Sequence, residues 1–304
     1  MKTAATPVRF TGGMVVPLIT PFTSDGSVDT TALSALCEFH IKAGTSCIFV
    51  LGTTGEFYGL TFDQRAQVVD TVLAAIDGRI PVICGISGDS TTTALETYRV
   101  CRRPSLSGYV ASTPYFLEYN QDELCDYFRS LSDVVGSLIL YNFPARYRHR
   151  IDISTVATLF KEKRAYAIKD TAGDFQYLRE LLELKKSHPE VLVLESALQN
   201  LGKSAPLGID GSVQAMGNLF PDTFAKLWMD IEQRRFEKVE EKAARYWAFH
   251  NKLTDKVPFI AALKSCMAAR GWCNAIPARP TREAKGDQAL KLRQATNEFL
   301  TSAE

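Results

Sequence analysis

Lys169, near the end of the segment Ala165–Asp170, is the residue of this chain that is best placed by its sequence context to carry out chemistry. The segment is a short apolar stretch that ends in Lys169 and Asp170, and the chain then turns at Gly173 towards a helix. Partial burial disfavours the ammonium form of a lysine and lowers its pKa, and the free amine can attack a ketone. The alternative is a structural lysine paired with Asp170 or another neighbour, since such pairs also perturb lysines. The segment alone leaves both interpretations open.

Polar residues follow two other apolar segments. The first is Gly52-Thr53-Thr54-Gly55-Glu56, where glycines allow close backbone approach and exposed N–H groups and hydroxyls suit a small carboxylate. A hydroxyl-rich turn that caps the next helix would have the same composition. The second is Tyr141, whose phenol could move protons while a carbinolamine forms and breaks down. A buried tyrosine that only hydrogen-bonds its hydroxyl is the alternative.

Eight short apolar segments could position these residues, because each is followed by a stretch with helical periodicity. This alternation is expected of parallel βα units, and a lysine or tyrosine at the carboxyl end of such a strand faces the active site of a barrel. We therefore predict a (β/α)8 TIM barrel rather than an open doubly wound sheet, where a nucleotide-binding loop would be expected early. The least hydrophobic of the predicted strands is the last. The strands are predicted at 14–20, 46–51, 81–86, 108–113, 137–142, 165–170, 191–195 and 210–215.

The rest of the chain is helical in pattern from about Asp222 onwards. Interruptions are expected at Lys256-Val257-Pro258 and at 274–280. The predicted organisation is a barrel over residues 1–235 with a C-terminal helical extension over residues 236–304 that packs beside it.

Composition excludes several classes of function. The 35 basic and 34 acidic residues give a net charge of +1 without a basic block, which argues against a nucleic acid partner. MKTAATPVRF lacks an apolar signal region and no later run is long enough to span a membrane, so no membrane partner is expected. The seven cysteines show no CxxC or Cys/His pattern, which predicts a reduced, cytoplasmic protein without a metal site.

In combination and order, four motifs closely resemble the pyruvate-dependent class I aldolase family that includes dihydrodipicolinate synthase and N-acetylneuraminate lyase. The resemblance runs from about residue 12 to 300. The matching residues are Gly52-Thr53-Thr54-Gly55-Glu56, Thr113-Pro114-Tyr115, Tyr141-Asn142-Phe143-Pro144 and Lys169-Asp170-Thr171-Ala172-Gly173.

The resemblance implies a role for each of these residues. Lys169 would form a Schiff base with the keto carbon of pyruvate or a 2-keto acid, so no separate cofactor and no metal would be required. Tyr141 would shuttle the proton and Thr53 would link it to a hydrogen-bonded relay. Thr54, Gly55 and the nearby backbone would hold the pyruvyl carboxylate, with the backbone around Val213 opposite.

Several departures from the synthase pattern bear on the substrate. Phe116 stands where the synthases carry a second tyrosine that reaches into the neighbouring subunit's relay, and a phenylalanine cannot relay protons. Arg146 occupies the place of an arginine that binds the aldehyde substrate's carboxylate, but its usual Thr-Gly neighbours are Tyr147-Arg148, and an exposed arginine is the alternative. Glu195 brings a bulkier acidic residue near the pocket. Thr171 resembles the residue that contacts substrate hydroxyls in the 2-keto-3-deoxy sugar acid aldolases.

The leading prediction is therefore a lyase that reversibly cleaves a 2-keto-3-deoxy sugar acid or a related 4-hydroxy-2-keto acid to pyruvate and an aldehyde. The alternatives are dihydrodipicolinate synthase itself, a keto-deoxy sugar acid dehydratase and a non-catalytic pyruvate-binding relative. The family resemblance also implies a homotetramer, arranged as a dimer of dimers, or a homodimer.

Overall fold

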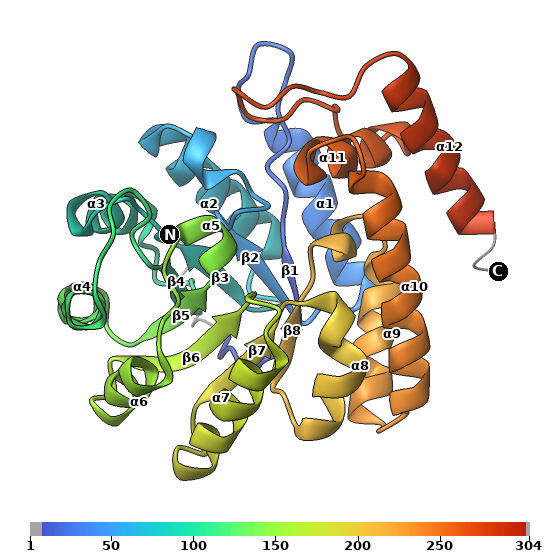
Figure 1. Ribbon diagram of the computed structural model, residues 1–304. Coiled ribbons are helices and arrows are strands. Elements are labelled where there is room, and N and C mark those ends of the chain that lie inside the picture. Colours follow the sequence, from blue (N-terminus) through green and yellow to red (C-terminus); the bar gives the residue numbers. More distant parts are fainter. Residues whose placement is uncertain (1–7, 302–304) are drawn as a thin grey trace.

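The computed structural model describes residues 8–301, in which eight parallel strands form a closed barrel (Figure 1). Each strand pairs with its neighbours in sequence order, and β8 returns to pair with β1. The predicted (β/α)8 TIM barrel is confirmed, including its weakly hydrophobic last strand, which has three residues. The strands are β1 Gly13–Pro17, β2 Cys47–Val50, β3 Val82–Gly85, β4 Gly108–Ser112, β5 Leu138–Asn142, β6 Ala165–Asp170, β7 Leu192–Glu195 and β8 Gly211–Val213.

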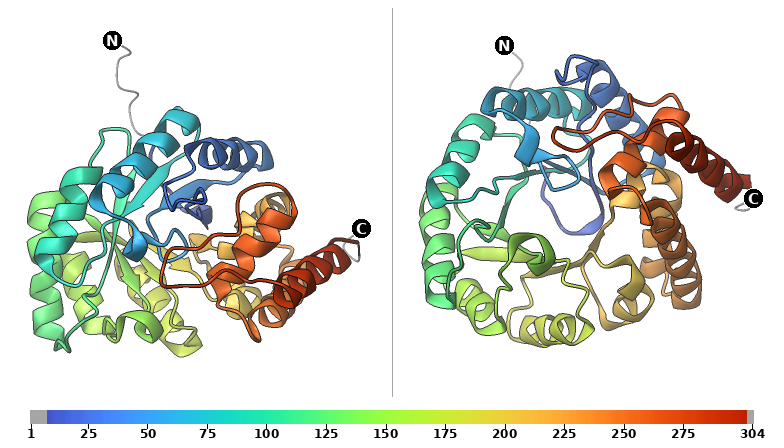
Figure 2. Two further views of the ribbon diagram at one scale, coloured as in Figure 1. Left: turned by 90° about the horizontal axis from the view of Figure 1, so that it is seen from above. Right: turned by 45° about the horizontal axis from the view of Figure 1, so that its top comes forward.

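Helices surround the barrel, and α9 contacts α1 so that the outer layer closes on itself (Figure 2). Short 3-10 helices lie at 57–59, 198–200, 205–207 and 215–218. The α-helices are α1 Thr30–Ala43, α2 Phe62–Ile76, α3 Thr91–Cys101, α4 Gln121–Val135, α5 Pro144–Tyr147, α6 Ile153–Lys161, α7 Phe175–Ser187, α8 Leu201–Ser204, α9 Pro221–Glu232, α10 Phe236–Thr254, α11 Phe259–Ala269 and α12 Asp287–Thr301.

Local sequence explains where the helices begin. Thr61 and Gln64 form a capping box at the start of α2, in which each side chain accepts a hydrogen bond from the other residue's backbone N–H. Ser90 caps α3, because its hydroxyl accepts a hydrogen bond from the N–H of Thr93. These caps supply partners for N–H groups that the first helical turn leaves free.

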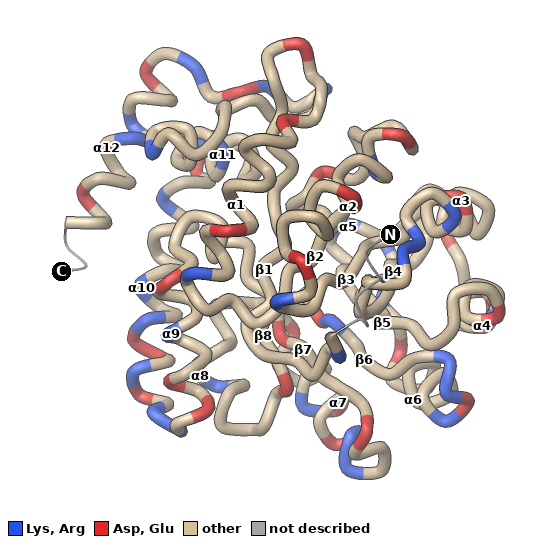
Figure 3. Tube along the Cα trace, turned by 180° about the vertical axis from the view of Figure 1, so that it is seen from behind, with Lys and Arg blue, Asp and Glu red and all other residues tan. Residues whose placement is uncertain are grey.

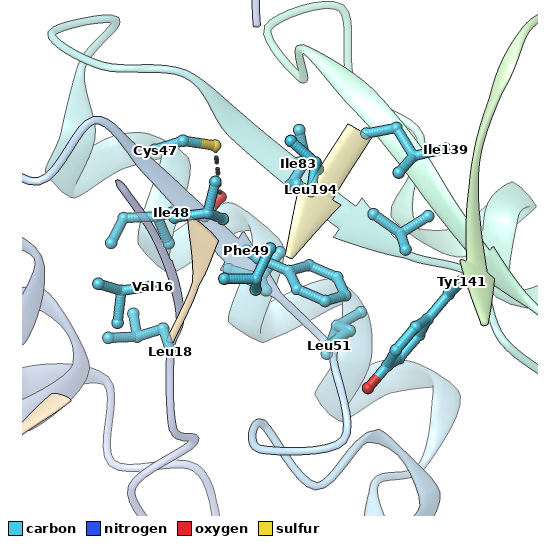
Figure 4. Packing of buried hydrophobic residues seen from close by; sticks show 14 of the residues in the cluster. Val16, Leu18, Cys47, Ile48, Phe49, Leu51, Ile83, Ile139, Tyr141 and Leu194 are labelled. Carbon is cyan, nitrogen blue, oxygen red and sulfur yellow. Dashed lines mark hydrogen bonds between the residues drawn. The ribbon is translucent and has the colours of Figure 1, made fainter. Parts of the chain in front are cut away.

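Alternation along the strands decides which side chains enter the barrel. Figure 4 shows Phe49, Ile139 and Leu194 packed within the buried core, and Tyr141 follows Ile139 on the same strand. Residues two apart on a strand point to the same side. Tyr141 is paired with Lys169 in the β5–β6 ladder, and Lys169 with Leu194 in the β6–β7 ladder. The fold therefore places the lysine and the tyrosine together at the carboxyl end of the barrel.

The C-terminal helices lie on one side of the barrel, in orange and red in Figures 1 and 2. Helix α10 packs against α8 and α9, and α11 packs against α12. The predicted interruptions coincide with the breaks before α11 and α12. Helix α10 begins at Phe236, but the division into two parts after residue 235 stays a prediction, and its outer ends fall on residues 1–7 and 302–304, outside the described residues.

A buried ion pair joins the barrel to this extension. Glu56, in the loop after β2, pairs with Lys264 of α11, and both side chains are fully buried. The Lys264 amine also donates to the carbonyls of Thr20 and Ile276, and Glu56 accepts from the N–H of Ala278. These bonds satisfy two charges that would otherwise be costly to bury.

Charged residues of both signs alternate along the outer helices (Figure 3). No helix within residues 8–301 is long and apolar enough to cross a membrane. In the same part of the chain, no group of three or more His, Cys, Asp and Glu side chains is arranged to hold a metal ion.

Candidate active site

A cavity of about 890 Å³ opens at the carboxyl ends of the strands, where barrel enzymes carry their active sites. Its floor includes Lys169, Tyr141 and Val213. A second wall comes from the C-terminal helices and the segment between them, with Trp247, His250, Thr254 and residues 257–260. The sequence predicted the floor but not this wall, because helical periodicity does not show which helix folds over the barrel mouth.

Lys169 is the one lysine among the described residues that line the cavity, and 4% of its surface is exposed. Its amine donates a 3.0 Å hydrogen bond to the hydroxyl of Thr171 and lies 3.4 Å from the centroid of the Tyr141 ring. Burial holds the pKa of the amine well below its ordinary range, although the nearby Asp170 carboxylate opposes this shift. No salt bridge to Lys169 is formed by the described residues, so the structural alternative of a pair with Asp170 is not what the geometry shows.

Asp170 points away from the amine into a separate polar contact. Its carboxylate accepts a 2.7 Å hydrogen bond from the Asn142 side chain and one from the backbone N–H of Ala172. Burial raises the pKa of this carboxyl to about 6, and the hydrogen bonds from Asn142 and Ala172 oppose the rise. The effect of Asp170 is thus to fix the turn after the lysine.

Tyr141 is 4% exposed and carries its hydroxyl into the cavity beside the lysine. Burial raises the pKa of the phenol to about 12, while hydrogen bonds to Thr53 and Thr171 oppose this. The phenol is therefore protonated at neutral pH and can act as a proton donor.

Thr53 stands between two phenols. Its hydroxyl lies 3.4 Å from that of Tyr141 and 2.8 Å from that of Tyr147. Tyr147 is not among the predicted site residues. The sequence shows it only as a residue that replaces the usual threonine beside Arg146. The signal available was its place on the one-turn helix α5, directly after the strand that ends in Tyr141 and Asn142.

The loop after β2 contains the residues for which a carboxylate-binding role is predicted. Thr54 lines the cavity beside Thr53, and neither backbone N–H donates a hydrogen bond to another described residue. Gly55 does not line the cavity. Its carbonyl accepts from the Thr20 hydroxyl, and a Cβ there would lie 2.9 Å from the Leu18 carbonyl oxygen. The geometry supports a packing role for this glycine rather than direct contact with a substrate.

Thr171 and Val213 both line the cavity. The Thr171 hydroxyl is directed at Lys169, so its first partner is the amine. The Val213 carbonyl accepts a 2.8 Å hydrogen bond from Ser196, which fixes the backbone on the opposite side.

Arg146 lies on α5 at the rim of the cavity and is exposed. No ion pair of its guanidinium with another described residue is present, whereas its neighbour Arg148 pairs with Glu118. An unpaired guanidinium facing a cavity suits an incoming carboxylate.

The other two departures lie away from the cavity. Phe116 is 74% exposed, and Tyr115 lines the cavity in its place. Glu195 is buried but is not among the lining residues, which begin with Ser196 on this strand end. One Glu195 oxygen accepts from the N–H of Ala197 and the other has no partner among the described residues. Glu195 thus lies behind the cavity wall.

Comparison with known proteins identifies the family to which this chain belongs. Residues 10–298 match the family model described as the dihydrodipicolinate synthetase family. A 4-hydroxy-tetrahydrodipicolinate synthase from Geobacter sulfurreducens is 33% identical over 219 residues, which is 71% of this chain and 73% of the relative. One from Chlorobium phaeobacteroides is 29% identical over 240 residues, covering 78% and 80%.

Solved structures agree with the sequence comparisons. YagE, a prophage protein of the dihydrodipicolinic acid synthase family from E. coli K12 solved with pyruvate, has a TM-score of 0.88 and 26% identity, with 96% of this chain and 99% of that chain covered. Dihydrodipicolinate synthase from Aquifex aeolicus has a TM-score of 0.85 and 26% identity, with 96% and 98% covered. The chain therefore belongs to the dihydrodipicolinate synthetase family, whose members are carbon–carbon lyases of the class I, pyruvate-dependent aldolase type.

Proposed function

We propose that this protein is a Schiff-base aldolase that reversibly cleaves a 4-hydroxy-2-keto acid of the 2-keto-3-deoxy sugar acid kind to pyruvate and an aldehyde. The observation that carries the proposal is the buried amine of Lys169, which lies beside the Tyr141 phenol at the floor of the cavity. A neutral amine and a protonated phenol are the two groups that imine formation from a ketone requires.

The chemistry follows from these positions. The Lys169 nitrogen attacks the keto carbon, and the carbonyl π electrons move to oxygen. A proton then passes from the nitrogen to this oxygen, which gives a neutral carbinolamine. Tyr141 then protonates the leaving hydroxyl, water departs, and a protonated imine remains on the lysine. This imine accepts the electron pair of the bond between C3 and C4 while the C4 hydroxyl gives its proton to water in the cavity, so that the aldehyde leaves and an enamine of pyruvate forms.

The carboxylate of the keto acid would be held by the loop after β2. The N–H groups of Thr53 and Thr54, which donate to no described residue, and the Thr54 hydroxyl are donors that a small anion could accept from. This subsite orients the keto carbon towards Lys169.

The rest of the cavity would hold the aldehyde part of the substrate. Beyond the lysine, the lining includes four residues that carry hydroxyl groups, which are Thr171, Ser196, Thr254 and Thr281. Hydroxylated chains are selected by sites that offer such partners. These residues support a hydroxylated keto acid as the substrate class.

A panel of aldehydes offered with pyruvate tests this proposal. We expect new 4-hydroxy-2-keto acids from short hydroxylated aldehydes, and Thr171→Ala should reduce their formation more than it weakens pyruvate binding. If the protein is offered a 2-keto-3-deoxy sugar acid instead, a dehydrated keto acid formed with no release of aldehyde would show a dehydratase. Stabilisation by pyruvate with no turnover of any aldehyde would show a binding protein.

Dihydrodipicolinate synthase is a second candidate, and Arg146 is the observation that favours it. Its guanidinium is unpaired among the described residues and faces the cavity, where it could bind the carboxylate of an aldehyde substrate. The curated relatives carry the synthase name. Arg146→Ala should then raise the KM for a carboxylate-bearing aldehyde alone, while Arg148→Ala serves as the matched control. Equal effects on neutral aldehydes would speak against this reading.

A further inference from the structure

Three hydroxyl groups form a continuous chain that starts beside Lys169. Tyr141 contacts Thr53 at 3.4 Å, and Thr53 contacts Tyr147 at 2.8 Å. All three residues belong to one subunit. Thr53 is the only described residue with which the Tyr147 hydroxyl hydrogen-bonds.

Packing of the Tyr147 side chain does not require its hydroxyl group. Its ring is 5% exposed and lies among the rings of Tyr115, Tyr141 and Phe143, with centroids 5.4 to 6.1 Å away. A phenylalanine would make these ring contacts equally well. Burying an extra hydroxyl costs free energy unless it is hydrogen-bonded, so the value of this one lies in its bond to Thr53.

That bond orders the protons along the chain. A threonine hydroxyl has a single proton and can accept from others. When the Tyr147 hydroxyl donates to Thr53, the Thr53 proton is free to point at the oxygen of Tyr141. The chain is then directed from Tyr147 towards the lysine.

We propose that Tyr147 is the positioning residue that returns protons to Tyr141 through Thr53, so that the proton relay of each active site is complete within one chain. This inference rests on the imine chemistry proposed above. It assigns no proton transfer to a residue of a neighbouring subunit.

The proton balance of imine formation shows why such a relay is needed. When Tyr141 protonates the hydroxyl of the carbinolamine, the C–O bond breaks, water leaves and a positive iminium remains. Tyr141 recovers a proton from Thr53, and Thr53 recovers one from Tyr147. Tyr147 lines the cavity and takes its proton from water there, so one proton is taken up in total.

With Tyr147 in this role, the relay does not need a hydroxyl at position 116. Phe116 has no hydroxyl and is 74% exposed. The position of the relay's second phenol is instead occupied from within the chain, by the turn of α5 that follows β5.

Rapid trapping of the imine with borohydride in the presence of pyruvate tests the proposal. Tyr147→Phe should slow imine formation about 10- to 100-fold, while the affinity for pyruvate changes less than about twofold. Thr53→Val should have a similar effect, and the double variant should lose little more, because the two hydroxyls act as one unit. Tyr127→Phe is the control, since it removes a buried hydroxyl that has no partner among the described residues.

Two results would overturn the relay. One is imine formation by Tyr147→Phe at the wild-type rate, and the other is a double variant whose loss is the product of the single losses. If the wild-type protein itself traps no pyruvate, the proposed function fails instead, so the two failures are distinguishable.

Mixed oligomers test whether the relay lies within one chain. Lys169→Ala and Tyr147→Phe chains, co-expressed with different tags, should show no activity beyond that of the separate variants. Recovered activity would mean that Tyr147 acts across a subunit boundary and would contradict the proposal. If the two chains do not associate, each site is left with its own Tyr147, as proposed.

Discussion

The amine of Lys169 lies over the ring of Tyr141, with its nitrogen 3.4 Å from the ring centroid. The two residues are direct partners in the parallel β5–β6 ladder. Their approach is therefore fixed by sheet register rather than by a flexible loop, and sites held on rigid elements keep their geometry best.

Tyr141→Phe tests the role of the phenol. The variant keeps the ring against the lysine but removes the proton donor, so imine formation should slow by about 100-fold or more. The rate of borohydride trapping with pyruvate measures this. Tyr166→Phe, which removes a buried hydroxyl without a described partner from the strand of the lysine, should leave the rate unchanged. Equal rates in Tyr141→Phe and wild type would exclude the phenol as the acid.

The strand-end residues could be predicted because strand alternation and the barrel's carboxyl-end rule are local and general. Lys169, Tyr141, Thr53 and Thr54 all reach one cavity for this reason. The position of Glu195 was harder to predict, because one step along a strand turns a side chain from the barrel interior to its outer face. Leu194 pairs with Lys169 in the β6–β7 ladder, so Leu194 and not Glu195 is the residue at the end of β7 that points into the barrel.

Other parts of the site depend on contacts between segments far apart in the chain. Trp247 and His250 enter the cavity wall only because α10 packs on α8 and α9, and their rings are stacked with centroids 4.8 Å apart. Likewise, the ion pair of Glu56 and Lys264 joins residues that no sequence periodicity relates. Tertiary packing decides such contacts.

This ion pair gives a prediction about stability. Glu56→Gln leaves the Lys264 charge buried without its anion and should lower the free energy of unfolding by about 3–5 kcal/mol. The Glu38–Arg79 pair is exposed, so Glu38→Gln should cost less than about 1 kcal/mol. Denaturant unfolding measures both. If the two variants lose the same stability, the buried pair does not hold the extension as described.

Glu195 gives a prediction about pH. Burial raises the pKa of this carboxyl from 4.5 to about 8, so between these values the folded protein binds a proton that the unfolded chain does not. Stability should therefore fall as the pH rises through this window. Glu195→Gln should flatten the fall, whereas Glu241→Gln, at an exposed position, should not. Free energies of unfolding at several pH values between 5 and 9 provide the comparison, and parallel curves for Glu195→Gln and wild type would contradict the assignment.

Covalent trapping of pyruvate tests the central claim most directly. The protein is incubated with pyruvate and borohydride, digested, and its peptides are analysed by mass spectrometry. We predict a reduced pyruvyl adduct on Lys169, formed faster as the pH rises through the lowered pKa of the amine, and no adduct in Lys169→Ala. An unmodified Lys169, or a pyruvyl adduct of equal amount on Lys264 or on an exposed lysine, would contradict the account.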